Sequence, residues 1–328
     1  MDSSQLFTFE TLPGVRGDLP LLVQARHEGI DLQDALAELR VLSAERLEKC
    51  GGLLLRGFHV GGAERFREFA AGFGHPLLKY EFGSTPRSNV TSGVYTSTEY
   101  PAHQHIPLHN EQAYTREWPM RIWFYCVQAA LVGGETPVAD SREVYRRVPQ
   151  AIRERFTERG LMYVRNFGNG LDVAWEQVFN TDNQQEVEAY CRQHSIECEW
   201  KDDGELRTRQ LCQAVARHPR TAEWVWFNQA HLFHISNLPQ QVRENLLEVV
   251  DEEDLPRNVY YGDGSPIEDS LLDEVRGVLE ETKVVFPWYS GDVLMLDNML
   301  AAHARSPFSG PRKVVVAMAE GHQASTLC

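Results

Sequence analysis

The residue types best suited to chemistry are a histidine and a carboxylate two positions apart, His109 and Glu111. Residues i and i+2 of an extended segment project to the same face, so one strand end can present both side chains to a metal ion. Imidazole and carboxylate, completed by one distant histidine, are the donor set that suits non-haem Fe(II) and leaves three coordination positions open. We therefore expect a metal centre built on this pair.

The third ligand has to come from elsewhere in the chain. We expect it to be His303, because this residue follows a Gly-Asp turn and the apolar segment 293–298, at the end of a late strand. His231 and His234 are a second option, since they are three positions apart and share a face only if their segment is helical.

Two further polar residues suit a dicarboxylate co-substrate. Thr136 carries a hydroxyl in the segment that follows the strand after the His-x-Glu pair, and Arg312 lies on the strand after His303. A guanidinium binds a carboxylate through two parallel hydrogen bonds, and a neighbouring hydroxyl adds another. Arg305 competes with Arg312 for this role, although its position two residues from His303 would crowd the same face. A surface ion pair is the other interpretation of Arg312.

The elements that must position these residues are expected to be strands, with helices between them. Hydrophobic periodicity and turn residues predict helices at 31–50, 64–73, 141–159 (with a break at Pro149), 186–193, 239–250 and 269–281, and strands at 53–55, 121–130, 284–288, 293–298 and 313–320. Residues 80–108 are polar and suit a loop that covers a site. Strands on both sides of a helical middle region suggest a sheet sandwich with helices inserted and added outside. We expect one domain over 1–328, with a helix-containing insertion around 143–223.

Composition narrows the class of protein. The 328 residues are 42% hydrophobic and 24% charged, which is ordinary for a globular chain with a large core. Lys and Arg number 32 against 47 Asp and Glu, so the net charge of −15 disfavours nucleic acid and anionic membranes as partners. Apolar runs fall far short of the roughly 20 residues of a membrane helix. The N-terminal residues lack signal-peptide features, and the six cysteines form no CxxC pair, so we expect reduced thiols and a cytoplasmic location.

The joint pattern of His109-x-Glu111, GGETPVAD with Thr136, and LDNMLAAHARSPFSGPR with His303 and Arg312 resembles the TauD/TfdA group of Fe(II)/2-oxoglutarate-dependent dioxygenases. Within that group, HNEQAY, WPMRIWFYC and GGETPVADSR are most similar to SyrP-like hydroxylases of nonribosomal peptide pathways. The resemblance spans about residues 53–320. It implies a double-stranded β-helix, or jelly-roll, core of two facing sheets.

The resemblance also implies site roles. His109, Glu111 and His303 would bind Fe(II), and Arg312 and Thr136 would bind the distal carboxylate of the co-substrate 2-oxoglutarate, with O2 as oxidant. Many members of the group carry Asp where this chain has Glu111. Halogenating relatives carry a small residue there, so the retained carboxylate argues against halogenation.

The implied reaction is hydroxylation of an unactivated carbon of an amino acid, free or tethered to a carrier protein. The same iron centre also hosts desaturation and cyclisation in this group. A zinc hydrolase could use the same three ligands, but it would have no role for Arg312 and Thr136 together. A non-catalytic binding protein with the same jelly-roll fold is the other alternative. Polar residues expected to contact the substrate are Gln104, Asn110, Asn228 and Arg121.

Overall fold

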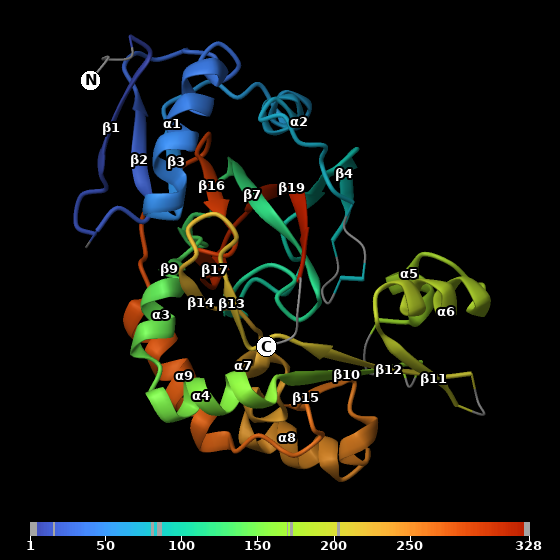
Figure 1. Cartoon of the computed structure of the whole chain (residues 1–328). Helices are drawn as coiled ribbons and strands as arrows, with labels where there is room; N and C mark the ends of the chain where they lie inside the picture. The colour runs from blue at the N-terminus through green and yellow to red at the C-terminus, as the bar shows by residue number, and fades with distance from the viewer. Residues whose placement is uncertain are drawn as a thin grey trace.

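The structure, a computed structural model, describes residues 5–15, 17–79, 82–83, 87–168, 170, 173–201 and 204–324. Within these residues the fold is mixed, with strands in several sheets and helices at the periphery (Figure 1). The helices are α1 (Leu36–Cys50), α2 (Ala63–Ala71), α3 (Ser141–Arg147), α4 (Gln150–Arg159), α5 (Trp175–Phe179), α6 (Gln184–Gln193), α7 (Ala230–Phe233), α8 (Gln240–Leu247) and α9 (Asp269–Thr282), with 3₁₀ turns at Ile235–Asn237 and Glu252–Asp254.

The largest sheet has eight strands and crosses the centre of the molecule (Figure 1). Its order is β1 (Phe7–Thr11), β2 (Leu21–Ala25), β3 (Gly52–Arg56), β16 (Val293–Asp297), β7 (Glu117–Gln128), β19 (Lys313–Gln323), β5 (Val94–Thr96) and β4 (Asn89–Thr91). Neighbours are antiparallel except β2 and β3, which are parallel.

Both faces of the central strands are buried, which explains their nearly continuous apolar sequences. On β16, Val293 and Met295 pack on one face with residues of α1 and α2, whereas Leu294 and Leu296 pack on the other. The same alternation runs along β7 and β19. The second face contacts Val138 and Ala301 of a smaller sheet, so the two sheets face each other across a shared core.

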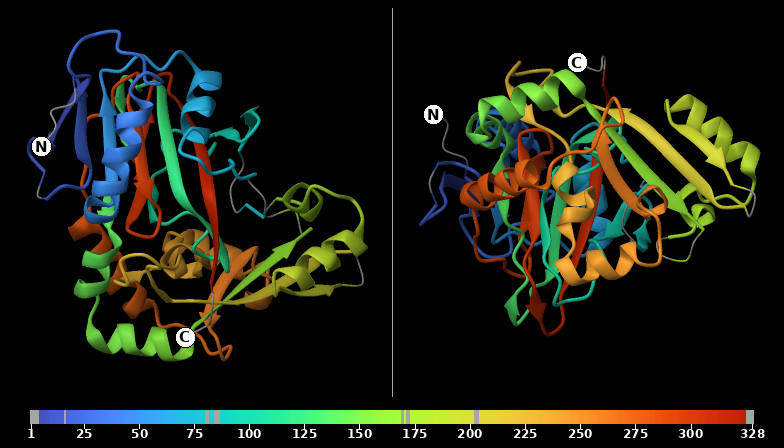
Figure 2. Two further views of the ribbon diagram at one scale, coloured as in Figure 1. Left: turned by 45° about the horizontal axis from the view of Figure 1, so that its top comes forward. Right: turned by 90° about the horizontal axis from the view of Figure 1, so that it is seen from below.

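That smaller sheet has the order β6 (Ile106–His109), β17 (Ala301–Arg305) and β9 (Val138–Asp140). A four-stranded sheet, β11 (Glu197–Trp200), β12 (Leu206–Cys212), β10 (Leu161–Phe167) and β15 (Arg257–Tyr261), lies beyond it with the helices α3, α4, α7 and α9 (Figure 2). Two two-stranded sheets complete the described structure: β13 (Val215–Arg217) with β14 (Trp224–Trp226), and β8 (Val132–Gly133) with β18 (Phe308–Ser309), which are far apart in sequence.

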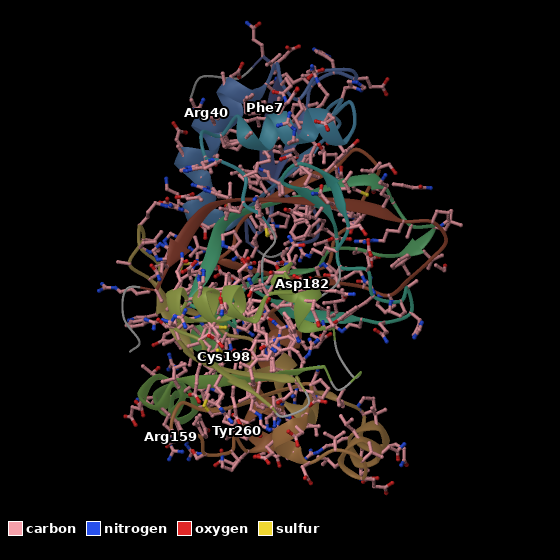
Figure 3. The ribbon with its side chains drawn as sticks, turned by 90° about the vertical axis from the view of Figure 1, so that its right-hand side faces the viewer. Phe7, Arg40, Arg159, Asp182, Cys198 and Tyr260 are labelled. Atoms are coloured by element: carbon pink, nitrogen blue, oxygen red, sulfur yellow. The ribbon has the colours of Figure 1, made fainter. Side chains whose placement is uncertain are left out.

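The molecule is longest in the direction that runs from the large sheet and α1 to the four-stranded sheet. In the side view of Figure 3, Phe7 and Arg40 mark the end formed by β1 and α1, and Arg159 and Tyr260 mark the opposite end formed by α4 and β15. Asp182, between α5 and α6, lies on the face toward the viewer.

Three predicted segments differ in the structure, and the first is 80–108, which was expected to be a loop but includes β4, β5 and most of β6. The strand expected at 284–288 forms only a single bridge, between Val284 and Val138, because Pro287 has no N–H to donate to a ladder. Phe286 and Trp288 of this segment are nevertheless buried. The first helix begins at Leu36 rather than Asp31, since Asp31 forms a parallel bridge with His59 instead.

Candidate functional site

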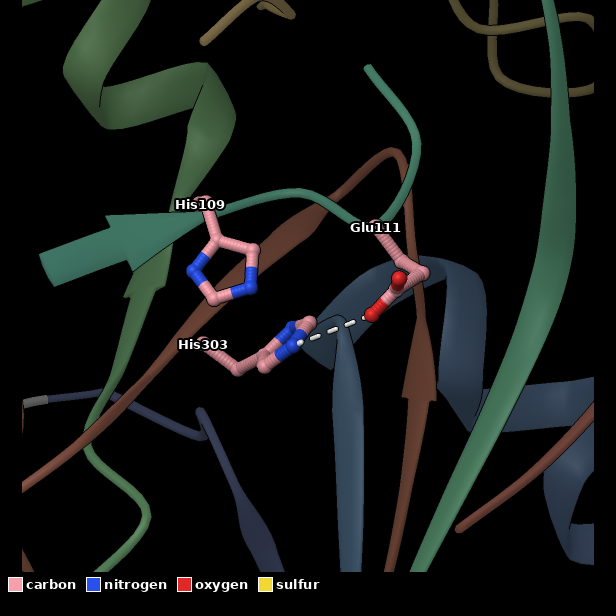
Figure 4. Close-up of side chains that lie close together, drawn as sticks. All are labelled: His109, Glu111 and His303. Carbon is pink, nitrogen blue, oxygen red and sulfur yellow. Dashed lines mark ion pairs between the residues drawn. The ribbon is translucent and has the colours of Figure 1, made fainter. Parts of the chain in front are cut away.

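The two predicted histidine ligands lie opposite each other in the smaller sheet. His109 is the last residue of β6, and His303, in the middle of β17, is its antiparallel partner in the register. Their ring centroids are 4.4 Å apart. With Glu111 they form the group of side chains whose candidate ligand atoms all lie within 4.8 Å of one another (Figure 4). The predicted convergence of these three residues is therefore present in the structure.

Glu111 reaches the site from a turn that begins two residues after the end of β6 at His109. Residues 111–114 form a turn, in which Gln112 has a positive φ of 56°. Asn298, which follows β16, fixes the backbone of the turn. The Glu111 amide donates to Asn298 Oδ1 at 2.7 Å, and Asn298 Nδ2 donates to the carbonyls of Glu111 and Pro119, both at 2.9 Å.

A hydrogen bond determines which nitrogen of His109 is left for the centre, whereas in His303 it is the position of the ring relative to Glu111 that does so. His109 Nδ1 donates to the carbonyl of Pro107 at 2.8 Å, which leaves Nε2 as the ligand atom. His303 Nε2 lies 3.7 Å from Glu111 Oε2, and its Nδ1 is buried with no hydrogen-bond partner among the described residues. Neither Asp297 nor Asn298, which precede His303 in the chain, bonds to this ring: Asn298 holds the Glu111 turn, and Asp297 contacts His218 and Arg220.

Burial sets the charge of these rings. Desolvation lowers the pKa of His109, and it lowers the pKa of His303 well below its ordinary value, with smaller contributions from His109 and Arg87. Both imidazoles are therefore neutral near pH 7, which is the form that binds a metal ion. Two neutral imidazoles and one carboxylate on one side of a cavity fit a divalent non-haem iron centre.

Arg87 is a residue of the site that sequence reasoning missed. Its Nη2 lies 2.7 Å from Glu111 Oε2, and the two side chains are only 3% and 5% exposed. Arg87 also lines the same cavity as His109 and His303. It lies in the polar segment before β4, twenty-four positions from Glu111, and no motif spacing links the two residues.

Arg312 and Thr136 line this cavity as well. The Arg312 Nε donates to the carbonyl of Gly134 at 2.9 Å, and Nη1 approaches Ser97 Oγ at 3.4 Å. Burial, reinforced by the charge of Arg305, lowers the pKa of Arg312 to about 10, so the side chain is still a cation at neutral pH. No carboxylate forms an ion pair with it within the described part of the chain. A partly buried cation beside a hydroxyl, on the wall of a metal-type cavity, fits a carboxylate of a co-substrate.

Arg305, the competitor of Arg312, is engaged elsewhere. Its two terminal nitrogens donate to four carbonyls of the preceding loop, those of Thr98, Tyr100, Pro101 and Gln104, at 2.8–3.2 Å. These bonds tie the loop to β17 and leave neither Nη atom without an acceptor. The geometry therefore favours Arg312 over Arg305 as the carboxylate-binding residue.

The four predicted substrate contacts are dispersed. Asn110 donates to Ser141 Oγ and to the carbonyl of Asn298, and Asn228 donates to the carbonyl of Ala214. Both amides are buried in networks that brace the site. The Nε of Arg121 donates to Glu320, and the side chain of Gln104 is exposed. Substrate binding by these four residues stays a prediction.

The second option for the third ligand was the pair His231 and His234, but only His231 lies in α7, and His234 follows the helix with an extended backbone. The Nε2 of His231 contacts the carbonyl of Leu108 at 2.8 Å, and burial lowers the pKa of His231 to about 4. It does not belong to the group formed by His109, Glu111 and His303.

The cysteines that the structure describes, Cys50, Cys126, Cys191, Cys198 and Cys212, are free thiols. Cys328 lies outside the described residues. Across the described ranges, no helix has the length and apolar character needed to cross a membrane.

Comparison with known proteins agrees with this geometry. The family model described as taurine catabolism dioxygenase TauD, TfdA family, matches residues 16–318. The dapdiamide synthesis protein DdaC of Enterobacter agglomerans is 44% identical over 274 residues, covering 84% of this chain and 83% of its own. A clavaminate synthase-like protein of Arabidopsis thaliana is 33% identical over 284 residues, covering 83% and 82%. The crystal structure of PvcB from Pseudomonas aeruginosa shares the fold, with a TM-score of 0.59 at 18% identity over 98% of this chain and 96% of PvcB.

Proposed function

Because the chain belongs to the TauD/TfdA family of Fe(II)- and 2-oxoglutarate-dependent dioxygenases, we propose that it hydroxylates an unactivated carbon of an amino acid, free or carrier-tethered, in secondary-metabolite biosynthesis. The similarity to a dapdiamide synthesis protein supports a biosynthetic role. The observation that carries the proposal is the convergence of His109, Glu111 and His303 in a cavity wall that also includes Arg312, a cation with no carboxylate partner among the described residues.

In this proposal His109, Glu111 and His303 hold Fe(II), and Arg312 and Thr136 hold the distal carboxylate of 2-oxoglutarate. When bound there, Fe(II), 2-oxoglutarate and O2 would supply the oxidation of a C–H bond to an alcohol, with 2-oxoglutarate converted to succinate and carbon dioxide. The buried imidazoles and the single carboxylate fit Fe(II), and the cation of Arg312 fits the dicarboxylate.

The chain's own contribution is positioning and exclusion of water. Phe124 of β7 packs on the ring of His303, with centroids 4.9 Å apart, and covers its side that faces the large sheet. Asn298 sets the backbone of Glu111, and Asn110 joins the same network through the Asn298 carbonyl. These contacts fix the donor atoms before any ligand arrives, which lowers the cost of assembling the centre.

The finer features of the fold are part of the same proposal. The large sheet and the β6–β17–β9 sheet, facing each other across one core, support a double-stranded β-helix. We assign the chain to one domain, with the helices and sheet around 143–223 as an insertion, and to the cytoplasm, where its free thiols stay reduced.

The test is an aerobic assay with Fe(II), 2-oxoglutarate and a panel of amino acids and carrier-bound aminoacyl groups, read by mass spectrometry. We expect succinate formation and a product heavier by one oxygen atom. A product lighter by two hydrogen atoms would indicate desaturation or cyclisation instead. The His109→Ala variant should lose both turnover and metal binding. Metal-independent hydrolysis of any panel member, or the absence of succinate with every member, would contradict the proposal.

A further inference from the structure

Arg87 contacts the candidate metal centre, formed by His109, Glu111 and His303, through one atom, the Oε2 of Glu111. This oxygen accepts a hydrogen bond from Arg87 Nη2 at 2.7 Å and lies 3.7 Å from His303 Nε2. Both partners of the ion pair are almost fully buried. The guanidinium therefore neutralises the same carboxylate oxygen that faces the two imidazoles.

A divalent ion and this guanidinium act against each other. An ion held by Glu111 and the two histidines would share the Glu111 carboxylate with Arg87. Its charge would then stand only a few ångströms from that of Arg87, in a site where water screens poorly. The metal also takes up much of the negative charge that Arg87 now neutralises. Metal binding thus weakens the ion pair between Glu111 and Arg87. It favours the binding of another anion by Arg87.

The other two arginines on the cavity wall are not available for that partner. Arg305 is occupied by four loop carbonyls, and Arg312 is assigned to the co-substrate in the proposed function. Arg87, Ser97 and Thr98 all line this cavity. Of the three guanidiniums, Arg87 is the one that forms an ion pair with a proposed metal ligand, Glu111.

We propose that Arg87 is the specificity-determining residue that receives a carboxylate of the substrate once the metal is bound. The inference rests on the proposed function and narrows its substrate class to compounds with a free carboxylate close to the carbon that reacts. A free amino acid meets this requirement. A carrier-bound aminoacyl group meets it only through an acidic side chain, because its own carboxylate is consumed in the thioester.

The first experiment measures Mn(II) affinity by calorimetry in wild-type protein and in Arg87→Gln and Arg87→Lys. We expect Arg87→Gln to bind Mn(II) at least tenfold more tightly, because a competing cation has been removed, and Arg87→Lys to lie closer to wild type. Arg155→Gln is the control, since it removes one positive charge from an exposed ion pair of the same 2.7 Å length on α4. Its Mn(II) affinity should equal that of wild type. Weaker or unchanged binding in Arg87→Gln would overturn the inference.

The second experiment tests the anion itself, with propionate and propionamide as probes of equal size. Each is titrated into protein saturated with Mn(II) and with N-oxalylglycine, a non-reactive mimic of 2-oxoglutarate. Wild type should bind propionate at least thirtyfold more tightly than propionamide. Arg87→Gln should lose this preference, and Arg87→Lys should keep part of it.

The outcomes separate the two proposals. If Mn(II) or N-oxalylglycine does not bind wild type, the proposed function fails and the role of Arg87 fails with it. If both bind and wild type does not distinguish propionate from propionamide, only the role of Arg87 is refuted. This comparison uses wild-type protein alone, so it stands even if a variant does not fold.

Discussion

At the residue scale, Arg312 is a cation held in place without a carboxylate of its own among the described residues. We expect Arg312→Gln to raise the KM for 2-oxoglutarate about 30- to 100-fold, because a charge-assisted hydrogen bond contributes about 2–3 kcal/mol. Mn(II) affinity should stay at the wild-type value. Steady-state kinetics with varied 2-oxoglutarate, together with Mn(II) calorimetry, measures both quantities.

Arg305→Gln is the matched comparison for that variant. It should destabilise the loop at 98–104 and leave the KM for 2-oxoglutarate within a few-fold of wild type, since its donors are used by loop carbonyls. A large KM effect in Arg305→Gln and none in Arg312→Gln would reverse the two assignments.

Asn298 fixes the backbone position of Glu111 through two hydrogen bonds. Asn298→Ala removes its three hydrogen bonds to the Glu111 and Pro119 backbone and leaves buried polar groups unsatisfied. We expect a loss of about 2–4 kcal/mol in the free energy of unfolding and at least a tenfold loss of Mn(II) affinity. Urea denaturation and calorimetry provide the two measurements.

Asn166→Ala separates a general loss of stability from a specific effect on the metal. Asn166 is equally buried and donates to the carbonyls of Glu253 and Leu255 in the four-stranded-sheet region. This variant should lose stability and keep its Mn(II) affinity. Equal loss of Mn(II) affinity in both variants would mean that Asn298 acts only through stability.

At the scale of elements, the loop between β8 and β9 depends on a glycine. Gly134 has a φ of 74°, and a Cβ there would lie 3.0 Å from Arg312 Cδ and 3.1 Å from its Nε. We expect Gly134→Ala to lower stability by about 1–2 kcal/mol through backbone strain. It should also raise the KM for 2-oxoglutarate several-fold, because the methyl group displaces Arg312.

Gly264→Ala is a control of the same backbone type. Gly264 has a φ of 83°, and the nearest atom to an added Cβ is Met162 Cε at 3.9 Å, remote from the site. It should lower stability by a similar amount and leave the KM unchanged. If Gly134→Ala also leaves the KM unchanged, the close approach of the loop to Arg312 has no effect on co-substrate binding.

At the scale of the whole molecule, Asp297 connects separate parts of the chain. Its carboxylate caps the turn between β16 and β17 through the amides of Met299 and Leu300, and it contacts His218 and Arg220 from the region before β14. Burial alone would raise the pKa of Asp297, but the hydrogen bond and charge of His218 and the neighbouring arginines outweigh it and lower that pKa.

The sign of the pH effect follows from that depressed pKa. The ionised Asp297 stabilises the folded state at pH values above about 3.9, the ordinary aspartate value, and this contribution is lost as the pH falls through the lower folded-state pKa. We expect the urea midpoint of wild type to fall on acidification below pH 4. Asp297→Asn should be less stable at pH 7 and show a flatter acid profile. A steeper acid profile in Asp297→Asn than in wild type would contradict this account.

Much of the architecture was predictable from local patterns. Apolar runs located β3, β7, β16 and β19, and helical periodicity located α2, α6 and α9 within a few residues. The strand at 284–288 was wrong, because its burial produces an apolar sequence while Pro287 and the tertiary path leave it without a ladder. Hydrophobicity reports burial, and it does not by itself report strand pairing.

The sequence by itself determined which side chains have the chemistry of the centre: two histidines, a glutamate, an arginine and a threonine, in a pattern shared with one enzyme family. Only the tertiary structure decided how they meet. The β6–β17 register places His109 opposite His303, Asn298 draws in the turn of Glu111, and the loop carbonyls occupy Arg305 and leave Arg312 to the cavity. Arg87 was found only in this way, because contacts between residues far apart in sequence depend on the packing of whole sheets and leave no periodic signal in the chain.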